Sequence, residues 1–181
     1  GAGKTTLFNI IAGAQTPDHG TIVLDGCRID GLRPDQICRL GIARTFQIVK
    51  TFAGLTVLDN VVIGALSCCT RVKDARERAD AILNNVGLGP KRNLTSALLT
   101  LSDRKLLELA RALATRPKLL LLDEVLGGLR STECDRLMAL LRDVTEREGI
   151  SLVLIEHVMR AVVALAQTVI PHAFLQAEQP A

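Results

Sequence analysis

Apolar residues along the chain change between helical spacing and short continuous runs. Those at positions 7–11 predict one face of a helix that ends at Gly13. Further helices are predicted at 34–41, 56–66, 71–85, 102–114, 132–146 and 158–166. A short hairpin is predicted around Asp25 and Gly26, and strands at 42–46, 119–122 and 151–155. Since strands alternate with helices, the pattern predicts an α/β fold with a parallel sheet flanked by helices.

The strands at 119–122 and 151–155 are continuous apolar runs, which predicts that both are buried. Between 51 and 100 the patterns are helical, beginning at Thr56, where Asp59 completes a variant of the capping box. We therefore expect an all-helical subdomain at 51–100. It would be inserted into a core formed by 1–50 and 101–181, incomplete at both ends.

Composition argues against several classes of protein. No apolar run approaches the ~18 to 20 residues that a membrane-spanning helix needs. The formal net charge of +3 is small and the basic residues are scattered, so no nucleic-acid partner is expected. The five cysteines lack metal-ligand or redox spacing and are expected to be small buried side chains in a reducing compartment. The chain opens on Gly1 without a signal peptide, and this start looks like a cut.

The first six residues form the second half of a G-x-x-x-x-G-K-[ST] phosphate-binding loop: Gly1, Ala2, Gly3, Lys4, Thr5 and Thr6. In such a loop, backbone N–H groups and a helix N-terminus surround phosphate oxygens. Lys4 would neutralise charge on the β- and γ-phosphates, the Thr5 hydroxyl would ligate Mg²⁺, and Thr6 would face the α-phosphate. For these six residues alone, an ordinary glycine turn before a helix is the alternative.

Polar side chains follow three of the predicted strands. Asp123 ends the leucine strand, where P-loop proteins hold Mg²⁺, and Glu124 directly after it can polarise the attacking water. Gln47 and His157 follow two other strands, and His157 could contact a γ-phosphate. The alternatives are a solvated acid that caps a strand end, and polar surface residues at the other two positions. The presence of Lys4 favours the functional interpretation.

The order of these segments resembles ATP-binding-cassette (ABC) ATPases, and within them the ATP-binding subunits of branched-chain amino acid importers. The resemblance covers nearly the whole chain and rests on motifs in the family's order. These are the Q-loop segment at 41–47 and the segment after it at 55–61, the helix after the signature motif at 109–114, the Walker B and D-loop region at 123–125 and 128–133, and the switch histidine segment at 155–157.

The resemblance implies a P-loop NTPase core that binds ATP and Mg²⁺. Gln47 would contact Mg²⁺, Glu124 would be the catalytic base, and His157 would hold the γ-phosphate. The family works as a dimer whose signature loop closes over ATP on the opposite subunit, so Thr100 and Ser102 would act in trans. The implied partners are transmembrane permease subunits and a second, identical or different, ATP-binding subunit. The location would be peripheral, at the cytoplasmic face of the membrane, and the cargo branched-chain amino acids.

Two motifs depart from the family pattern. The signature LSGGQ falls on 99–103, so both glycines are replaced and Asp103 stands where glutamine is usual. Asp103 would bring negative charge near an anion unless it points away. Arg130 replaces the aspartate of the D-loop. These departures keep open a non-hydrolysing regulatory subunit. Urea or amide import and a soluble ABC ATPase without a membrane partner are further alternatives.

The sequence contains no Tyr or Trp, so the aromatic residue that stacks on adenine in this family is expected before Gly1. The chain alone is therefore expected to bind ATP poorly.

Overall fold

The structure is a computed structural model of the chain, and it describes residues 3–45 and 51–165. The first part contains helix α1 (Lys4–Ile11), strands β1 (Val23–Leu24) and β2 (Cys27–Arg28), helix α2 (Pro34–Arg39) and strand β3 (Ile42–Arg44). The second contains α3 (Val57–Ala65), α4 (Val72–Asn85), the 3₁₀ turns η1 (Gly89–Lys91) and η2 (Ser96–Leu98), and α5 (Leu101–Ala114). It ends with β4 (Leu119–Asp123), α6 (Ser131–Glu148), β5 (Ser151–Ile155) and α7 (Met159–Leu165).

Three strands form a parallel sheet in the order β3-β4-β5, as the alternating pattern predicts. Ile42 pairs with Leu119, and Leu119 pairs in turn with Ser151, so the strands begin in register. Asp123, the last residue of β4, pairs with Ile155, the last residue of β5. β1 and β2 form a separate antiparallel hairpin.

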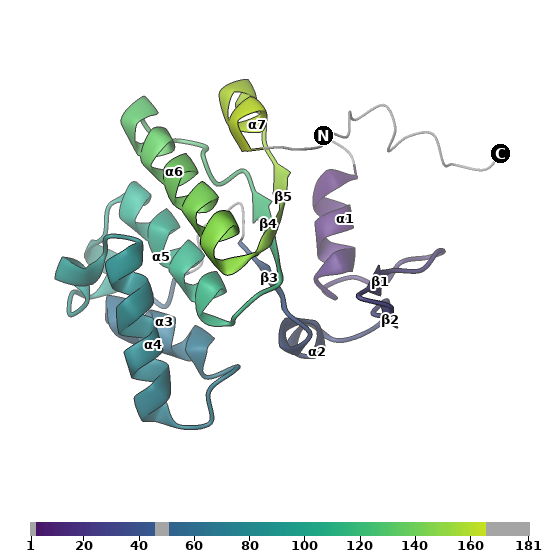
Figure 1. Ribbon diagram of the computed structural model, residues 1–181, viewed down its shortest axis with the longest axis horizontal. Coiled ribbons are helices and arrows are strands. Elements are labelled where there is room, and N and C mark those ends of the chain that lie inside the picture. The colour runs from purple at the N-terminus through teal and green to yellow at the C-terminus, as the bar shows by residue number, and fades with distance from the viewer. Residues whose placement is uncertain (1–2, 46–50, 166–181) are drawn as a thin grey trace.

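The sheet separates two apolar clusters, because successive side chains of a strand point to opposite faces. Leu120 and Leu122 join the larger cluster with α3 to α6, whereas Leu121 joins the smaller one with Phe8 of α1 and Ile37 of α2. Figure 1 shows the same layers: α5 and α6 lie on one side of the sheet and α1 on the other. The leucine run of β4 is therefore buried on both faces, as the sequence predicts.

Helices α3 and α4 pack against α5, which leads into β4. Gly64 allows α3 to approach α5 closely: a Cβ at this position would lie 2.5 Å from the carbonyl oxygen of Arg111. α3 begins where the capping box predicts, since the Thr56 hydroxyl accepts a hydrogen bond from the Asp59 N–H at 3.0 Å. The helices of 51–100 thus pack against α5 and belong to the same apolar cluster.

Two expectations about burial are wrong. β5 is not buried along its length, because Ser151 is exposed and Val153 is 40% exposed, while Ile155 is buried. Of the cysteines, only Cys134 is buried; Cys27 and Cys68 are exposed and the other two are partly exposed. Sequence periodicity reports which residues are apolar, but whether another element covers them depends on tertiary packing.

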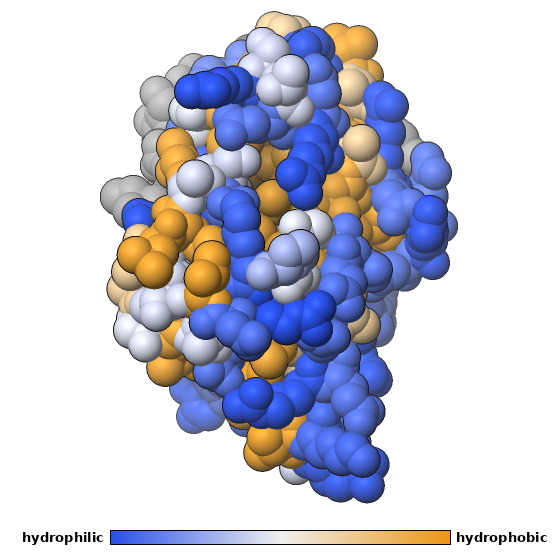
Figure 2. All heavy atoms as spheres, turned by 90° about the vertical axis from the view of Figure 1, so that its left-hand side faces the viewer, coloured by the Kyte–Doolittle hydropathy of each residue, from blue (hydrophilic) through white to orange (hydrophobic). Residues whose placement is uncertain are grey.

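The surface is mainly hydrophilic on the side that faces the viewer in Figure 2, with separate apolar areas between charged side chains. Exposed apolar residues of the helices in 51–100 include Ile63 of α3, Leu66 at the C-cap of α3, and Val72 of α4. Across residues 3–45 and 51–165, no helix has the length and apolar character needed to span a membrane.

Candidate functional site

The site predicted from the sequence lies at one edge of the sheet. The strands are parallel, so the carboxyl ends of β3, β4 and β5 meet there. Figure 1 shows that the N-terminal end of α1 lies at the same end of the molecule as the carboxyl ends of β4 and β5. Lys4 is the first residue of α1, Asp123 ends β4, and His157 is two residues beyond β5. The fold therefore brings four separate segments of the chain to this edge.

The phosphate-loop residues that the structure describes, 3–6, form the N-cap and the first turn of α1. Gly3 is the N-cap, and its φ of 97° lies in a region that favours glycine. Thr5 and Thr6 are exposed and Lys4 is partly buried. α1 has no acidic residue in its first turn, so its N–H groups and dipole favour an anion. Gly1 and Ala2 lie outside the described residues.

Asp123 is held by an arginine that the sequence analysis did not single out. Arg44 Nη2 donates to Asp123 Oδ2 at 3.1 Å, and the two side chains are only 8% and 2% exposed. Arg44 also donates to Asn9 Oδ1 of α1. Thr45 accepts a hydrogen bond from the Asp123 N–H at 3.4 Å. Arg44 thus joins α1, β3 and the end of β4, and its only signal in the sequence was its place three residues before Gln47.

Glu124 has a left-handed backbone conformation with φ of 50°. Its N–H donates to the carbonyl of Ile155 at 2.9 Å, which continues the β4-β5 pairing by one residue. Its own carbonyl accepts the Gly127 N–H at 3.2 Å, so the chain turns sharply after the strand. This turn, residues 124–127, places the carboxylate at the edge of the sheet instead of within it.

His157 is exposed at the same edge and follows Glu156, which the sequence analysis did not assign a role. Glu156 Oε1 accepts the Leu126 N–H at 2.9 Å, so the segment before His157 is attached to the 124–127 turn. Lys105 of α5 is also attached to this turn and was likewise missed. Gln47 lies outside the described residues.

Two polar side chains of the segment that aligns with the signature motif make hydrogen bonds within the subunit. Thr100 is the N-cap of α5, and its Oγ1 accepts the Asp103 N–H at 3.2 Å and donates to Asp103 Oδ2 at 2.8 Å. Lys91 Nζ lies 2.5 Å from the same oxygen. Burial opposes ionisation of the Asp103 carboxyl, but the hydrogen bonds from Lys91 and Thr100 outweigh it and lower its pKa. The Thr100 hydroxyl and the Asp103 carboxylate are therefore engaged within the subunit, while Ser102 is partly exposed in the first turn of α5.

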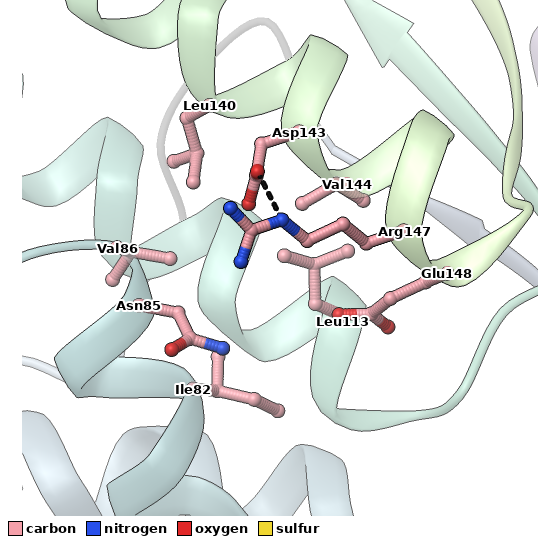
Figure 3. A pocket seen from close by; sticks show the side chains of 9 residues that line it. All are labelled: Ile82, Asn85, Val86, Leu113, Leu140, Asp143, Val144, Arg147 and Glu148. Atoms are coloured by element: carbon pink, nitrogen blue, oxygen red, sulfur yellow. Dashed lines mark ion pairs between the residues drawn. The ribbon is translucent and has the colours of Figure 1, made fainter.

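A cavity of about 220 Å³ lies away from this edge, between α4, α5 and α6. Its lining includes Leu113 and Glu148, which precede β4 and β5, so it is at the opposite end of the strands. Figure 3 shows apolar side chains and the ion pair of Asp143 with Arg147 in this cavity. It is separate from the candidate site.

A helix that begins within a G-K-T segment, an acidic turn after one strand and a polar residue after the next strand form an arrangement typical of P-loop α/β proteins. The model of the ABC transporter family matches residues 1–127. The chain therefore belongs to the ABC transporter family, whose ATP-binding cassettes are ATPases coupled to transport.

Curated relatives agree with this assignment. The chain is 33% identical to the high-affinity branched-chain amino acid transport ATP-binding protein LivG of Escherichia coli K12, with 93% of this chain and 72% of the relative covered. It is 34% identical to BraF of Pseudomonas aeruginosa, named for the same transport, with 94% and 72% covered. It is also 35% identical to the methionine import ATP-binding protein MetN of Helicobacter hepaticus, with 90% of this chain but 47% of the relative covered.

Solved structures show the same fold. The ADP conformation of MJ1267, an ATP-binding cassette of an ABC transporter, is 27% identical with a TM-score of 0.77, covering 89% of this chain and 68% of that one. A dimeric, post-hydrolysis structure of the cassette MJ0796 bound to ADP and Pi is 25% identical with a TM-score of 0.79, covering 90% and 73%.

Proposed function

We propose that this chain binds and hydrolyses Mg²⁺-ATP as the energy-coupling subunit of an importer of branched-chain amino acids. The observation that supports it is that the start of α1, the end of β4 and the segment after β5 lie at the same end of the sheet. These segments carry Lys4, Asp123 with Glu124, and His157. In this proposal residues 1–50 and 101–181 form the nucleotide-binding core, and 51–100 form the helical subdomain.

The residues have separate tasks in the proposed reaction. The backbone of Gly1, Ala2 and Gly3 and the start of α1, with Thr6, surround the phosphates, and Lys4 neutralises their β- and γ-oxygens. Glu124 accepts a proton from the attacking water, and His157 holds the γ-phosphate. Phosphoryl transfer depends mainly on such positioning and electrostatic stabilisation.

The residues present fit a magnesium ion. Mg²⁺ prefers oxygen ligands and keeps several waters or phosphate oxygens, so a site needs only one or two protein ligands. Thr5 offers an exposed hydroxyl and Asp123 a carboxylate fixed by Arg44, and Gln47 is the third proposed ligand. When bound, the ion would neutralise negative charge on the phosphates.

Replacing Glu124 tests hydrolysis. In the protein assembled with a second ATP-binding subunit and its permease subunits, Glu124→Gln removes the base and keeps the shape of the side chain. We expect the ATPase kcat to fall by about 100-fold or more. Glu146→Gln, at an exposed position of α6, is the matched control and leaves kcat unchanged. Turnover that survives Glu124→Gln ends the proposed hydrolysis.

A regulatory subunit that binds nucleotide without hydrolysing it is a second candidate. It is favoured by the signature segment, where Thr100 and Lys91 both contact Asp103. In that case the wild-type subunit contributes no turnover of its own, and its Glu124→Gln variant behaves like wild type. ATP binding that depends on Lys4 then remains.

The transported solute is proposed from the relatives named for branched-chain amino acid transport. The ATP-binding subunit contacts permease subunits at the cytoplasmic face of the membrane and acts with a second ATP-binding subunit. Uptake of labelled leucine and of labelled urea by vesicles that contain the assembled transporter separates the two candidate cargoes. Uptake of urea without leucine contradicts this assignment.

A further inference from the structure

Two side chains from other elements hold the turn that carries Glu124. Lys105 Nζ, in the second turn of α5, donates to the carbonyl oxygens of Val125 at 2.8 Å and Glu124 at 3.3 Å. Glu156, which directly follows β5, contacts the same turn: its Oε1 accepts the Leu126 N–H at 2.9 Å. Two consecutive peptide groups of the turn, 124–125 and 125–126, are therefore held by a helix and by the segment after β5.

The conformation of this turn requires support. Glu124 has φ of 50°, and the left-handed region is unfavourable for a residue other than glycine. The hydrogen bond from Gly127 N–H to the Glu124 carbonyl closes the turn but does not fix where it points. Contacts from outside the turn must therefore keep the carboxylate of Glu124 at the edge of the sheet.

Both holding residues, Lys105 and Glu156, are partly buried. Burial lowers the pKa of the Lys105 ammonium, while the nearby carboxylates of Glu156 and Glu108 act in the opposite direction. Glu156 Oε2 is buried and accepts no hydrogen bond within the described residues, so the contact of this side chain with Leu126 is made through Oε1 alone. Removing both charged groups from water costs free energy. Their hydrogen bonds to the turn partly offset this cost.

We propose that Lys105 and Glu156 are positioning residues that fix the orientation of Glu124 for catalysis. This inference rests on the proposed function. Glu156 directly precedes His157, so its bond to Leu126 also fixes the distance between the segments that carry the base and the γ-phosphate contact. Lys105 belongs to α5, the helix that begins within the signature segment. A shift of α5 would therefore move the turn through this hydrogen bond.

Matched substitutions at Glu156 test the contact. Glu156→Gln keeps an oxygen that can accept the Leu126 N–H, whereas Glu156→Leu removes it. In the assembled transporter we expect Glu156→Leu to lower the ATPase kcat by about 10- to 100-fold, because a misplaced reacting group can cost ~100-fold. The KM for ATP should change less than about twofold, and Glu156→Gln should retain most of the wild-type kcat.

Lys105 is tested in the same way. Lys105→Met should lower kcat by a similar factor at unchanged KM, and Lys105→Arg should recover part of it because a guanidinium can donate to both carbonyls. Lys73→Met, on the exposed surface of α4, is the control and leaves both constants unchanged. Hydrogen exchange at the Leu126 amide gives a second readout: it should accelerate at least about tenfold in Glu156→Leu and stay slow in Glu156→Gln.

The outcomes separate the two proposals. Equal kcat values for Glu156→Leu and Glu156→Gln overturn the positioning roles, as does a rise in KM with kcat unchanged. If Lys105→Met fails to fold, the Glu156 pair alone decides. If Glu124→Gln leaves turnover intact, the proposed hydrolysis fails instead, and the exchange of the Leu126 amide still reports whether Glu156 holds the turn.

Discussion

Arg44 Nη2 lies 3.1 Å from Asp123 Oδ2, and almost no part of either side chain is exposed. The pair joins two residues that are 79 positions apart in the chain. Through Asn9, the same guanidinium also contacts the helix that begins with Lys4. The orientation of the Asp123 carboxylate, the proposed Mg²⁺ ligand, therefore depends on the guanidinium of Arg44 on the neighbouring strand β3.

Arg44→Met should destabilise the protein by about 3–5 kcal/mol, because it leaves the Asp123 carboxylate buried without its cation. The free energy of unfolding is measured by denaturant titration. Arg39→Met, which removes an exposed arginine of α2, should change it by less than about 1 kcal/mol. The double variant Arg44→Met/Asp123→Leu should regain most of the loss, and failure to do so contradicts the pairing.

Gly64→Ala should destabilise the contact between α3 and α5. Alanine favours a helix by up to about 1 kcal/mol over glycine, but its Cβ would lie 2.5 Å from the Arg111 carbonyl oxygen. Overpacking of this kind costs about 1–3 kcal/mol, so the melting temperature should fall. The control is Gly54→Ala, where a Cβ meets open space and the melting temperature should not decrease.

Asp103 should make stability depend on pH in acid. Burial opposes ionisation of its carboxyl, but the hydrogen bonds from Lys91 and Thr100 lower its pKa in the folded state. A carboxyl with a lowered pKa stabilises the fold above its unfolded value of about 4, and this contribution is lost as the pH falls through the folded pKa. Denaturant titrations from pH 6 to pH 2 should show a shallower acid slope for Asp103→Asn than for wild type. Identical slopes would contradict the contact with Lys91.

Asn60 organises the segment before α3. Its side chain is fully buried, accepts the Phe52 N–H at 2.9 Å, and donates to the carbonyls of Phe52 at 3.1 Å and Thr56 at 2.9 Å. Asn60→Ala should cost about 1–3 kcal/mol because it leaves these backbone groups unpaired. Asn93→Ala, at an exposed position, should change the free energy of unfolding by no more than about 0.5 kcal/mol. Equal effects of the two substitutions would show that the Asn60 contacts contribute little.

Much of the fold could be predicted from the sequence because its signals are local. The leucine run of β4, the helical spacing of α5 and the Thr56 cap each depend on residues within a few positions, and all three agree with the structure. The order of the motifs also identified the family. The roles of Lys4, Asp123, Glu124 and His157 remain predictions.

Other features of the site are contacts between distant segments, which a periodic pattern does not encode. The sequence placed Asp103 in the signature segment, but only the tertiary structure decided that its charge meets Lys91 instead of facing outward. The same holds for Lys105 and Glu156, whose bonds to the 124–127 turn depend on how α5 and β5 are packed. Side-chain hydrogen bonds form over about 3 Å, so the pairing of residues far apart in the chain is decided by packing.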